Sequence, residues 1–317
     1  MRLKLNTMKA VRIHSYGSSD VLFYEDAPRP TAGAGEVLVR VHATTVNPFD
    51  VAVRAGYLSG YFNHTLPLTL GTDVSGVVEE VGAGVTNFAP GDLVYGRAGV
   101  TRDGANADYV SVAASDLAAK PVSVDHIHAA ALPHVTLTAW QALYVAAEIC
   151  EGQTVLIHAA AGGVGHVAVQ LAKLRGAKVI CTASLNLDFL KDLDVDEAID
   201  YSTHSFEDVA TGVDVVLDLV GGDTQERSWP LLKPGGILIS TVQPPSAEMA
   251  AAHGVRQHFV TSAPPIGETL AEVAALVDSG QIIPTVSTVL PLQEVRRAHD
   301  LIEGKHTRGK IALSVVA

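Results

Sequence analysis

The sequence predicts an α/β protein in which a doubly wound parallel sheet is combined with a β-rich region. Three observations predict this fold. Residues 154–173 have the pattern of a strand, a small-residue turn and a helix. Residues from about 127 onward alternate between helical and strand patterns, and residues 8–126 consist of short β segments separated by glycine and proline turns. A chain of 317 residues is also too long for most single cores, so two domains are expected.

The stretch from Thr154 to Lys173 is the strongest local signal. A β-rich apolar run, 154–158, leads into a turn of small residues and then into a helix with one apolar face. This order predicts the start of a dinucleotide-binding βαβ unit, in which small residues allow a tight turn, close approach to a pyrophosphate and close packing of the helix. The helix N-terminus would supply N–H groups to the phosphates. The predicted cofactor-binding residues here are Ala160, Gly162, Gly163, Val164 and Gly165. The alternative is a glycine turn that only connects strand to helix.

The remaining elements follow from periodicity and turn residues. Before the glycine turn, strands are expected at 37–43, 74–81, 92–96 and 107–112, and a helix near 127–147. After it, strands are expected at 178–182, 197–200, 213–219, 236–241 and 258–261, with helices near 186–192 and 223–232. The last segment predicts a helix at 268–279, a β segment at 282–290, a helix at 293–303 and a strand at 310–315.

Composition excludes several classes of function. The chain is 48% hydrophobic and 18% charged, which indicates a well-buried globular protein, and its net charge of -12 argues against nucleic acid or an anionic membrane as partner. No apolar run approaches the roughly 20 residues of a membrane span. The first residues lack the pattern of a signal peptide, so a cytoplasmic location is expected. Cys150 and Cys181 are expected to be free thiols.

Several short motifs besides the glycine turn occur in a fixed order along nearly the whole chain. They are 35–41 (GEVLVRV), 46–50 (VNPFD), 70–78 (LGTDVSGVV), 81–85 (VGAGV), 88–94 (FAPGDLV), 137–140 (LTAW) and 308–311 (RGKI). In this order they resemble the medium-chain dehydrogenase/reductase superfamily. Within it, the chain is similar to the zinc-free quinone oxidoreductase (zeta-crystallin-like) branch.

This resemblance implies how the two domains are built. A GroES-like β-rich catalytic domain would comprise residues 1–126 and 265–317, and a Rossmann nucleotide-binding domain would comprise residues 127–264. The active site would lie in the cleft between them, and the protein would form a homodimer through the nucleotide-binding domain.

A metal site is not expected. Zinc needs three or four converging Cys, His or carboxylate ligands. The zinc alcohol dehydrogenases of the superfamily have a cysteine where this chain has Val46–Asp50, and a Gly-His-Glu where it has Gly71-Thr72-Asp73. None of the first 149 residues is cysteine, so the four-cysteine structural lobe is also absent. His64 and Asp73 are the remaining conceivable ligands, but a solvated loop histidine is the favoured interpretation of His64.

The cofactor is expected to be NADPH. An NAD site usually has an acidic residue about 20 positions beyond the glycine turn, whereas here the second strand leads into Thr182–Asn186 without one. The resemblance implies that Ser184, Tyr201 and Arg308 contact the cofactor. The usual Lys or Arg after the strand is missing, and Asp188 is nearby. Tyr201 as a surface aromatic and Arg308 as a solvated arginine remain the alternatives.

The expected reaction is hydride transfer to a quinone or to an α,β-unsaturated carbonyl (enone), because these substrates are electrophilic without a Lewis acid. Asn47 and Tyr57 are the predicted catalytic residues. Asn47 would hydrogen-bond a carbonyl or the nicotinamide ribose, and the Tyr57 phenol would protonate the enolate. The alternative is that Tyr57 only lines the pocket. Tyr61 is the second candidate for the proton donor.

Three further residues are predicted to lie by the cofactor: Thr138, Val220 and Val242. Thr138 is otherwise a hydroxyl bonded to its own helix. The sequence therefore predicts an NADPH-dependent, zinc-independent oxidoreductase. The alternatives are a non-catalytic, crystallin-like NADPH-binding protein and a zinc alcohol dehydrogenase.

Overall fold

The computed structural model describes residues 7–261 and 265–316. Contacts among the described residues divide the chain into two compact units. Unit 1 comprises Met1–His134, Pro265–Gly280 and Pro284–Ala317, and unit 2 comprises Val135–Pro264 and Gln281–Ile283. The boundary therefore falls a few residues beyond the predicted position 126/127. The predicted domain limits at residues 1, 264 and 317 lie outside the described residues, and the domain assignment stays a prediction.

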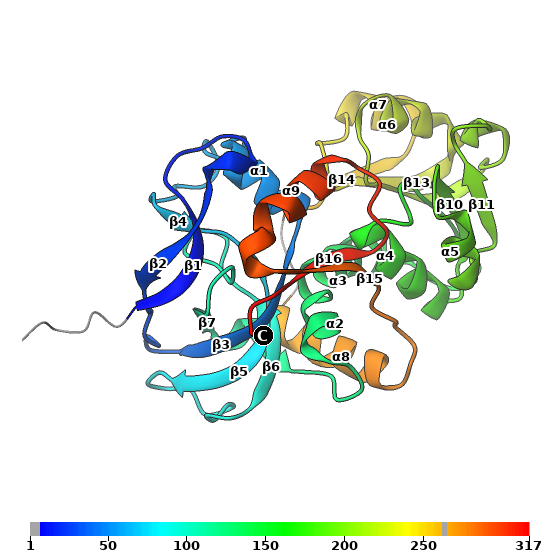
Figure 1. Ribbon diagram of the computed structural model, residues 1–317. Helices are drawn as coiled ribbons and strands as arrows, with labels where there is room; N and C mark the ends of the chain where they lie inside the picture. Colours follow the sequence, from blue (N-terminus) through cyan, green and yellow to red (C-terminus); the bar gives the residue numbers. More distant parts are fainter. Residues whose placement is uncertain (1–6, 262–264, 317) are drawn as a thin grey trace, which may run out of the picture. The chain divides into compact units, whose positions relative to one another are not determined.

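Unit 1 is built on a seven-stranded sheet formed by both ends of the chain. Figure 1 shows the C-terminal strand β16, in red, beside the N-proximal strand β3, in blue. The order is β15 (Val286–Pro291), β16 (Lys310–Ser314), β3 (Glu36–Val46), β5 (Asp73–Val81), β6 (Leu93–Arg97) and β8 (Leu117–Ala119), with β7 (Tyr109–Ala113) paired to β3. A smaller sheet has the order β2 (Leu22–Pro28), β1 (Thr7–Ile13) and β4 (Leu68–Thr69).

Four helices complete unit 1 in the described part of the chain: α1 (Pro48–Ala55), α2 (His126–Ala130), α8 (Ile266–Asp278) and α9 (Val295–Glu303). α1 and α9 pack on each other, and their apolar side chains share one core with the two sheets. Val53 of α1 and Val295 of α9 lie in that core with Ile311 of β16. The C-terminal strand is therefore part of the same core as the first helix, and it fixes the segment that follows β3.

Unit 2 contains a parallel six-stranded sheet with the order β11 (Glu197–Asp200), β10 (Lys178–Ala183), β9 (Thr154–Ile157), β12 (Val213–Asp218), β13 (Leu232–Ser240) and β14 (Arg256–Phe259). The chain fills positions on one side of β9 and then moves to the other side with β12. This order places a topological switch point between β9 and β12, where doubly wound sheets bind their ligands. The predicted α/β class with a doubly wound parallel sheet is confirmed.

The other helices are α3 (Pro133–Trp140), α4 (Gly163–Leu174), α5 (Leu187–Asp192), α6 (Gly222–Ser228) and α7 (Ala247–His253). The single helix expected near 127–147 is wrong. α2 ends at Ala130, α3 begins at Pro133, and residues Gln141–Ala146 are π-helical. The break has a physical cause, because proline has no N–H to donate and disfavours helical backbone in the residue before it. The β segment expected from 282 begins only at Val286.

α1 and α7 were not predicted from the sequence. α1 begins with Asn47 at the N-cap and proline at the first helical position, and the Asp50 carboxylate accepts a hydrogen bond from the Asn47 N–H at 2.8 Å. These are recognised helix-start signals. At the start of α7 the N-cap side chain is the acceptor, and the Ser246 hydroxyl oxygen accepts from the Met249 N–H. Both helices are short, and their start signals are more informative than their periodicity.

Candidate functional site

The glycine turn of unit 2 has the geometry of a phosphate cradle. After β9, Ala159 adopts a left-handed backbone with φ of 50°, and α4 starts directly after Gly162. A side chain at Gly165 would place its Cβ 2.6 Å from both the Ala159 carbonyl oxygen and the Ala160 Cα. Because no real Cβ fits at that distance, glycine is what allows the helix to pack directly on the turn.

The N-terminus of α4 is open to a ligand. The His166 N–H bonds the Gly162 carbonyl at 3.1 Å, so the N–H groups of Gly163, Val164 and Gly165 precede the first helical hydrogen bond. Within the described residues, no side chain caps this N-terminus. Unsatisfied N–H groups at the positive end of a helix dipole suit phosphate oxygens. The cradle therefore fits the pyrophosphate of a dinucleotide.

Further predicted cofactor residues of unit 2 lie at the same edge of the sheet. Ser184, Tyr201, Val220 and Val242 follow the carboxyl ends of β10, β11, β12 and β13, respectively, and the glycine turn follows β9. The carboxyl ends of parallel strands share one edge, which brings these positions together. Tyr201, Val220 and Val242 are each about half exposed (51%, 48% and 51%), so a ligand at this edge could contact them. Thr138 lies on α3.

A buried carboxylate shapes two of these loops. Asp218 ends β12 and is fully buried. Its Oδ1 accepts hydrogen bonds from the N–H groups of Val220 and Gly221 at 2.9 and 2.8 Å, and its Oδ2 accepts from Gln225 and from the Ser240 hydroxyl. The Ser240 oxygen in turn accepts from the Val242 N–H at 3.2 Å. One carboxylate thus holds the Val220 and Val242 loops together.

Sequence reasoning missed Asp218. The available signal was an acidic residue at the end of a largely apolar strand, three positions before the pair Gly221-Gly222. A buried acid in that place requires several donors, and the backbone N–H groups of the following turn supply two of them. Asp218 organises the edge of the sheet without being exposed on it.

Unit 1 contains a buried polar cluster around Asp73, which begins β5. The Asp73 Oδ2 accepts hydrogen bonds from the Thr45 hydroxyl, from Asn47 Nδ2 at 2.8 Å and from Lys310 Nζ at 3.3 Å. Its Oδ1 accepts from the His134 N–H at 2.7 Å. Asp73 and Lys310 are 0% and 3% exposed, so this ion pair is shielded from solvent.

The side-chain amide of Asn47 has a chemically fixed orientation. Lys310 can only donate and bonds the Asn47 Oδ1, whereas the Asp73 carboxylate can only accept and bonds Nδ2. The second Nδ2 hydrogen faces the Thr72 hydroxyl at 3.2 Å. Asn47 is 1% exposed, and all its polar atoms are bonded in this arrangement. Its catalytic and cofactor-binding roles stay predictions.

Burial, neighbouring charges and hydrogen bonds have opposing effects on the pKa values of the cluster. Burial disfavours a charged Asp73, but the ammonium of Lys310, the nearby His134 and the bonds from Thr45 and Asn47 together lower the pKa of Asp73. Burial raises the pKa of Asp50 to about 6 against the bond from the Asn47 N–H. Burial also lowers the pKa of His134 to about 4, so its imidazole is neutral at pH 7.

Tyr57 and Tyr61 lie in the segment after α1, and their side chains are largely exposed (78% and 83%). The start of this segment is anchored through Arg54, in the last turn of α1. Arg54 is buried, and its guanidinium forms two hydrogen bonds with the Glu303 carboxylate of α9 at 3.1 and 2.9 Å. Tyr57 thus follows a fixed helix end while its phenol remains accessible. The other predicted residue of unit 1, Arg308, lies in the loop before β16.

Two kinds of feature are absent from the described part of the chain. Among these residues, no group of three or more His, Cys, Asp or Glu side chains could hold a metal ion. Over the same ranges, no helix combines the length and the apolar character needed to cross a membrane.

Comparison with known proteins gives two domain families and close relatives. Residues 33–122 match the alcohol dehydrogenase GroES-like domain, and residues 193–313 match a family described as zinc-binding dehydrogenase. The mouse mitochondrial NAD(P)H oxidoreductase RTN4IP1 is 34% identical, with 98% of this chain and 89% of the relative covered. The structure of a quinone oxidoreductase from Coxiella burnetii is 36% identical, with a TM-score of 0.91 and coverage of 98% and 100%. The chain belongs to the medium-chain dehydrogenase/reductase superfamily, quinone oxidoreductase branch.

A third relative of this superfamily carries a more specific name. The chloroplastic NADPH-dependent alkenal/one oxidoreductase of Arabidopsis thaliana is 34% identical, with 96% of this chain and 79% of the relative covered. These relatives confirm the predicted superfamily, the GroES-like domain and the class of enzyme, an oxidoreductase that uses a nicotinamide cofactor. The open cradle at α4 is the part of this medium-chain reductase that fits such a cofactor.

Proposed function

We propose that this medium-chain reductase uses NADPH, without zinc, to reduce a quinone or an α,β-unsaturated carbonyl. The open N-terminus of α4 beside the glycine turn carries the proposal, because it is built for a dinucleotide pyrophosphate. The preference for NADPH is supported by the loop after β10, where Ser184 and Leu185 stand in place of an acidic residue. A carboxylate there would hold a ribose 2′-hydroxyl and repel a 2′-phosphate. The name of the Arabidopsis relative also supports NADPH.

The residues of this chain then have defined tasks. The glycine turn and α4 would hold the pyrophosphate. The 2′-phosphate end of the cofactor would be bound by Ser184, Tyr201 and Arg308. The nicotinamide end would be contacted by Thr138, Val220 and Val242. Bound NADPH supplies a hydride. Hydride addition to the β-carbon of an enone leaves an enolate, and we propose that the Tyr57 Oη delivers a proton to the α-carbon. Asn47, held by Asp73 and Lys310, keeps the loop before α1 in place.

Zinc independence is supported by the side chains in the positions where zinc relatives have ligands. Asn47 bonds the Asp73–Lys310 pair, and Thr72 accepts from Asn47. Neither amide nor hydroxyl is a typical zinc ligand. The ammonium of Lys310, next to Asp73, would also repel a cation at this position.

The first test is the consumption of NADPH and NADH with a panel of quinones and enones, on the wild type and on Tyr57→Phe. We expect NADPH to be preferred and the variant to lose roughly a hundredfold in enone reduction, because the phenol proton is removed. Tyr61→Phe is the matched control and should retain activity, since it removes the other exposed phenol of the same segment. Full enone activity in Tyr57→Phe would make Tyr57 a wall of the pocket. No turnover by the wild type would overturn the proposed reaction.

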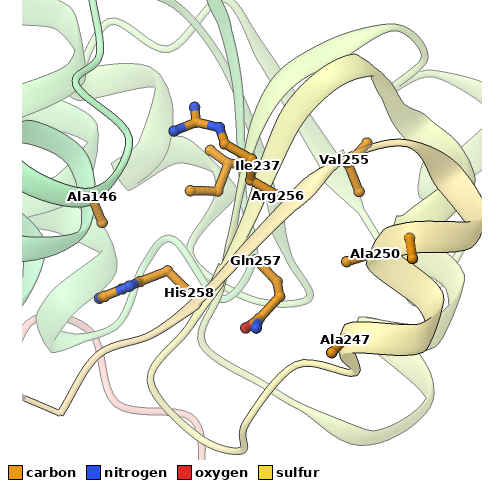
Figure 2. A pocket seen from close by; sticks show the side chains of 9 residues that line it. Ala146, Ile237, Ala247, Ala250, Val255, Arg256, Gln257 and His258 are labelled. Carbon is orange, nitrogen blue, oxygen red and sulfur yellow. The ribbon is translucent and has the colours of Figure 1, made fainter.

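We also propose that the enzyme is a homodimer. β14 is an edge strand of the unit 2 sheet, and edge strands present unpaired backbone groups to another chain. Figure 2 shows the surface depression beside it, with a volume of about 550 Å³. Its lining comes from β14 (Arg256, Gln257, His258), α7 (Ala247, Ala250, Ala251) and Ala146, Ile237 and Val255. None of the predicted site residues lines it, which supports a role in assembly. Light scattering should give twice the mass of one chain, and a monomer mass would contradict the proposal.

A cytoplasmic location is proposed on the basis of thiol chemistry. Cys150 and Cys181 are both free, and the Cys181 thiol is buried among apolar strands. Free thiols are typical of reducing compartments. Several relatives are named as mitochondrial or chloroplastic, which are also intracellular locations of those proteins. Fluorescence microscopy of the tagged full-length protein tests this proposal, and an organellar or secreted signal would contradict it.

A further inference from the structure

Arg97 is a partly buried arginine for which the described residues provide no ion pair. It ends β6, in the same seven-stranded sheet of unit 1 as the Asp73 cluster. Its guanidinium has no hydrogen bond or ion pair with any side chain or carbonyl in the parts of the chain that the structure describes. Other partly or fully buried arginines differ in this respect: Arg29 bonds Glu79, and Arg54 bonds Glu303.

The register of the sheet places Arg97 beside the Asp73 cluster. Asp73 of β5 pairs directly with Arg97 of β6 in an antiparallel ladder, so both side chains stand on the same face of the sheet. The next N–H of the chain, that of Ala98, bonds the Thr72 carbonyl at 2.7 Å. Arg97 therefore lies next to the segment whose side chains bond Asn47.

The neighbouring acids do not neutralise Arg97. The oxygens of Asp73 already accept from Thr45, Asn47, Lys310 and the His134 N–H, and Lys310 balances its charge. Asp116 also attracts the guanidinium but forms no ion pair with it. Burial lowers the pKa of Arg97 despite the attraction of both acids, so its guanidinium is partly desolvated. A guanidinium desolvated in this way gains strongly from an anion.

We propose that Arg97 binds a carboxylate carried by the substrate of this reductase. A planar guanidinium offers donors in a fork that matches the two oxygens of a carboxylate. The neutral His134 imidazole and the Thr72 hydroxyl, 3.4 Å apart, belong to residues next to Asp73 and add no negative charge. The inference rests on the proposed function, because it specifies which enones or quinones the enzyme prefers. These are substrates with an anionic group near the reducible bond.

The test compares 4-oxopent-2-enoate with its methyl ester, which differ only in the charge of the carboxyl group. With NADPH, the wild type should reduce the acid with a kcat/KM roughly 10- to 100-fold higher than the ester, as expected of a hydrogen bond between charged groups. Arg97→Met should abolish this preference by raising KM for the acid while leaving the ester unchanged. Arg97→Lys should retain part of it, because an ammonium keeps the charge but loses the fork.

Arg40→Met is the matched control. Arg40 lies on β3 of the same sheet, is 40% exposed and pairs with Val77, four positions along β5 from Asp73, so the variant makes the same change of charge at a distance from the Asp73 cluster. It should keep the wild-type preference for the acid. An equal kcat/KM for acid and ester in the wild type, or an unchanged preference in Arg97→Met, would overturn the inference.

A binding experiment tests this inference separately from the proposed reaction. 4-Oxopentanoate has the same carboxylate but no reducible C=C bond, and its binding to the protein loaded with NADP⁺ can be followed by calorimetry. Tighter binding to the wild type than to Arg97→Met would support the carboxylate site even if no enone were reduced. Equal binding to both proteins, or none to the wild type, would overturn it whatever the reaction. Failure of turnover alone would count only against the proposed function.

Discussion

Replacing Lys310 with methionine is expected to lower the free energy of unfolding by about 3–5 kcal/mol, as expected when one partner of a buried ion pair is removed. The Lys310 ammonium bonds both the Asp73 carboxylate and the Asn47 amide oxygen in a solvent-shielded position. Its removal leaves a buried carboxylate without its compensating charge. Chemical denaturation of the purified wild type and variant measures the difference.

Two controls identify the unpaired carboxylate as the cause. In Lys310→Met with Asp73→Asn, no buried charge remains at this position, and the double variant should recover part of the stability lost in the single variant. The loss in Lys310→Met should also shrink as the pH falls. In the wild type the pKa of Asp73 is lowered, so its contribution persists into acid. Without Lys310, burial favours the protonated acid, which needs no counter-charge. A deficit that is independent of pH would argue for lost packing instead.

Gly165→Ala is expected to weaken NADPH binding by at least roughly tenfold and to destabilise unit 2 by about 1–3 kcal/mol. The new Cβ would lie 2.6 Å from two backbone atoms of the turn, the Ala159 oxygen and the Ala160 Cα. Backbone atoms cannot rotate away as a flexible side chain can, so α4 must move off the turn. The N–H groups at its start then lose their alignment with the phosphates. Titration of NADPH by fluorescence and thermal unfolding measure the two effects.

Gly99→Ala is the comparison for that experiment. Its Cβ would contact only the flexible side chain of Arg102, at 3.4 Å, so binding and stability should change little. If Gly165→Ala bound NADPH as the wild type does, close packing of α4 on the turn would not be what prepares the cradle. A loss of stability without a loss of binding would lead to the same conclusion.

The features that could be predicted from the sequence are local ones. The turn at Gly162–Gly165 and the alternation of strands and helices depend on residues within about 20 positions of one another, and the sequence pattern is sufficient to predict both. The break at Pro133 is also a local signal, but it was outweighed by the apolar periodicity on either side. The motif order then identified the superfamily, which in turn suggested the two-part organisation.

The Asp73 cluster could not be assembled in the same way. Asn47 and Lys310 are 263 positions apart, and nothing in the sequence pairs a lysine in the terminal strand with an asparagine before the first helix. The sequence around either residue gives no sign that the two side chains are in contact. Only the antiparallel pairing of β16 with β3 brings them together, and pairing over such a distance depends on the whole fold. The position of Arg97 could not be predicted for the same reason, because it depends on the pairing of β6 with β5, which places Arg97 opposite Asp73.

Because β16 pairs with β3, the larger sheet of unit 1 can be completed on the ribosome only after residues 310–314 have been synthesised. Lys310 is synthesised 263 residues after Asn47 and 237 residues after Asp73. At the usual rate of about 5–20 residues per second, the acidic side chain remains without its cation for tens of seconds. Until then the first half of the chain is a nascent intermediate with an open sheet edge along β3. Unit 2 is encoded almost continuously and has all its strands before the C-terminal segment appears, so the nucleotide-binding part can mature first.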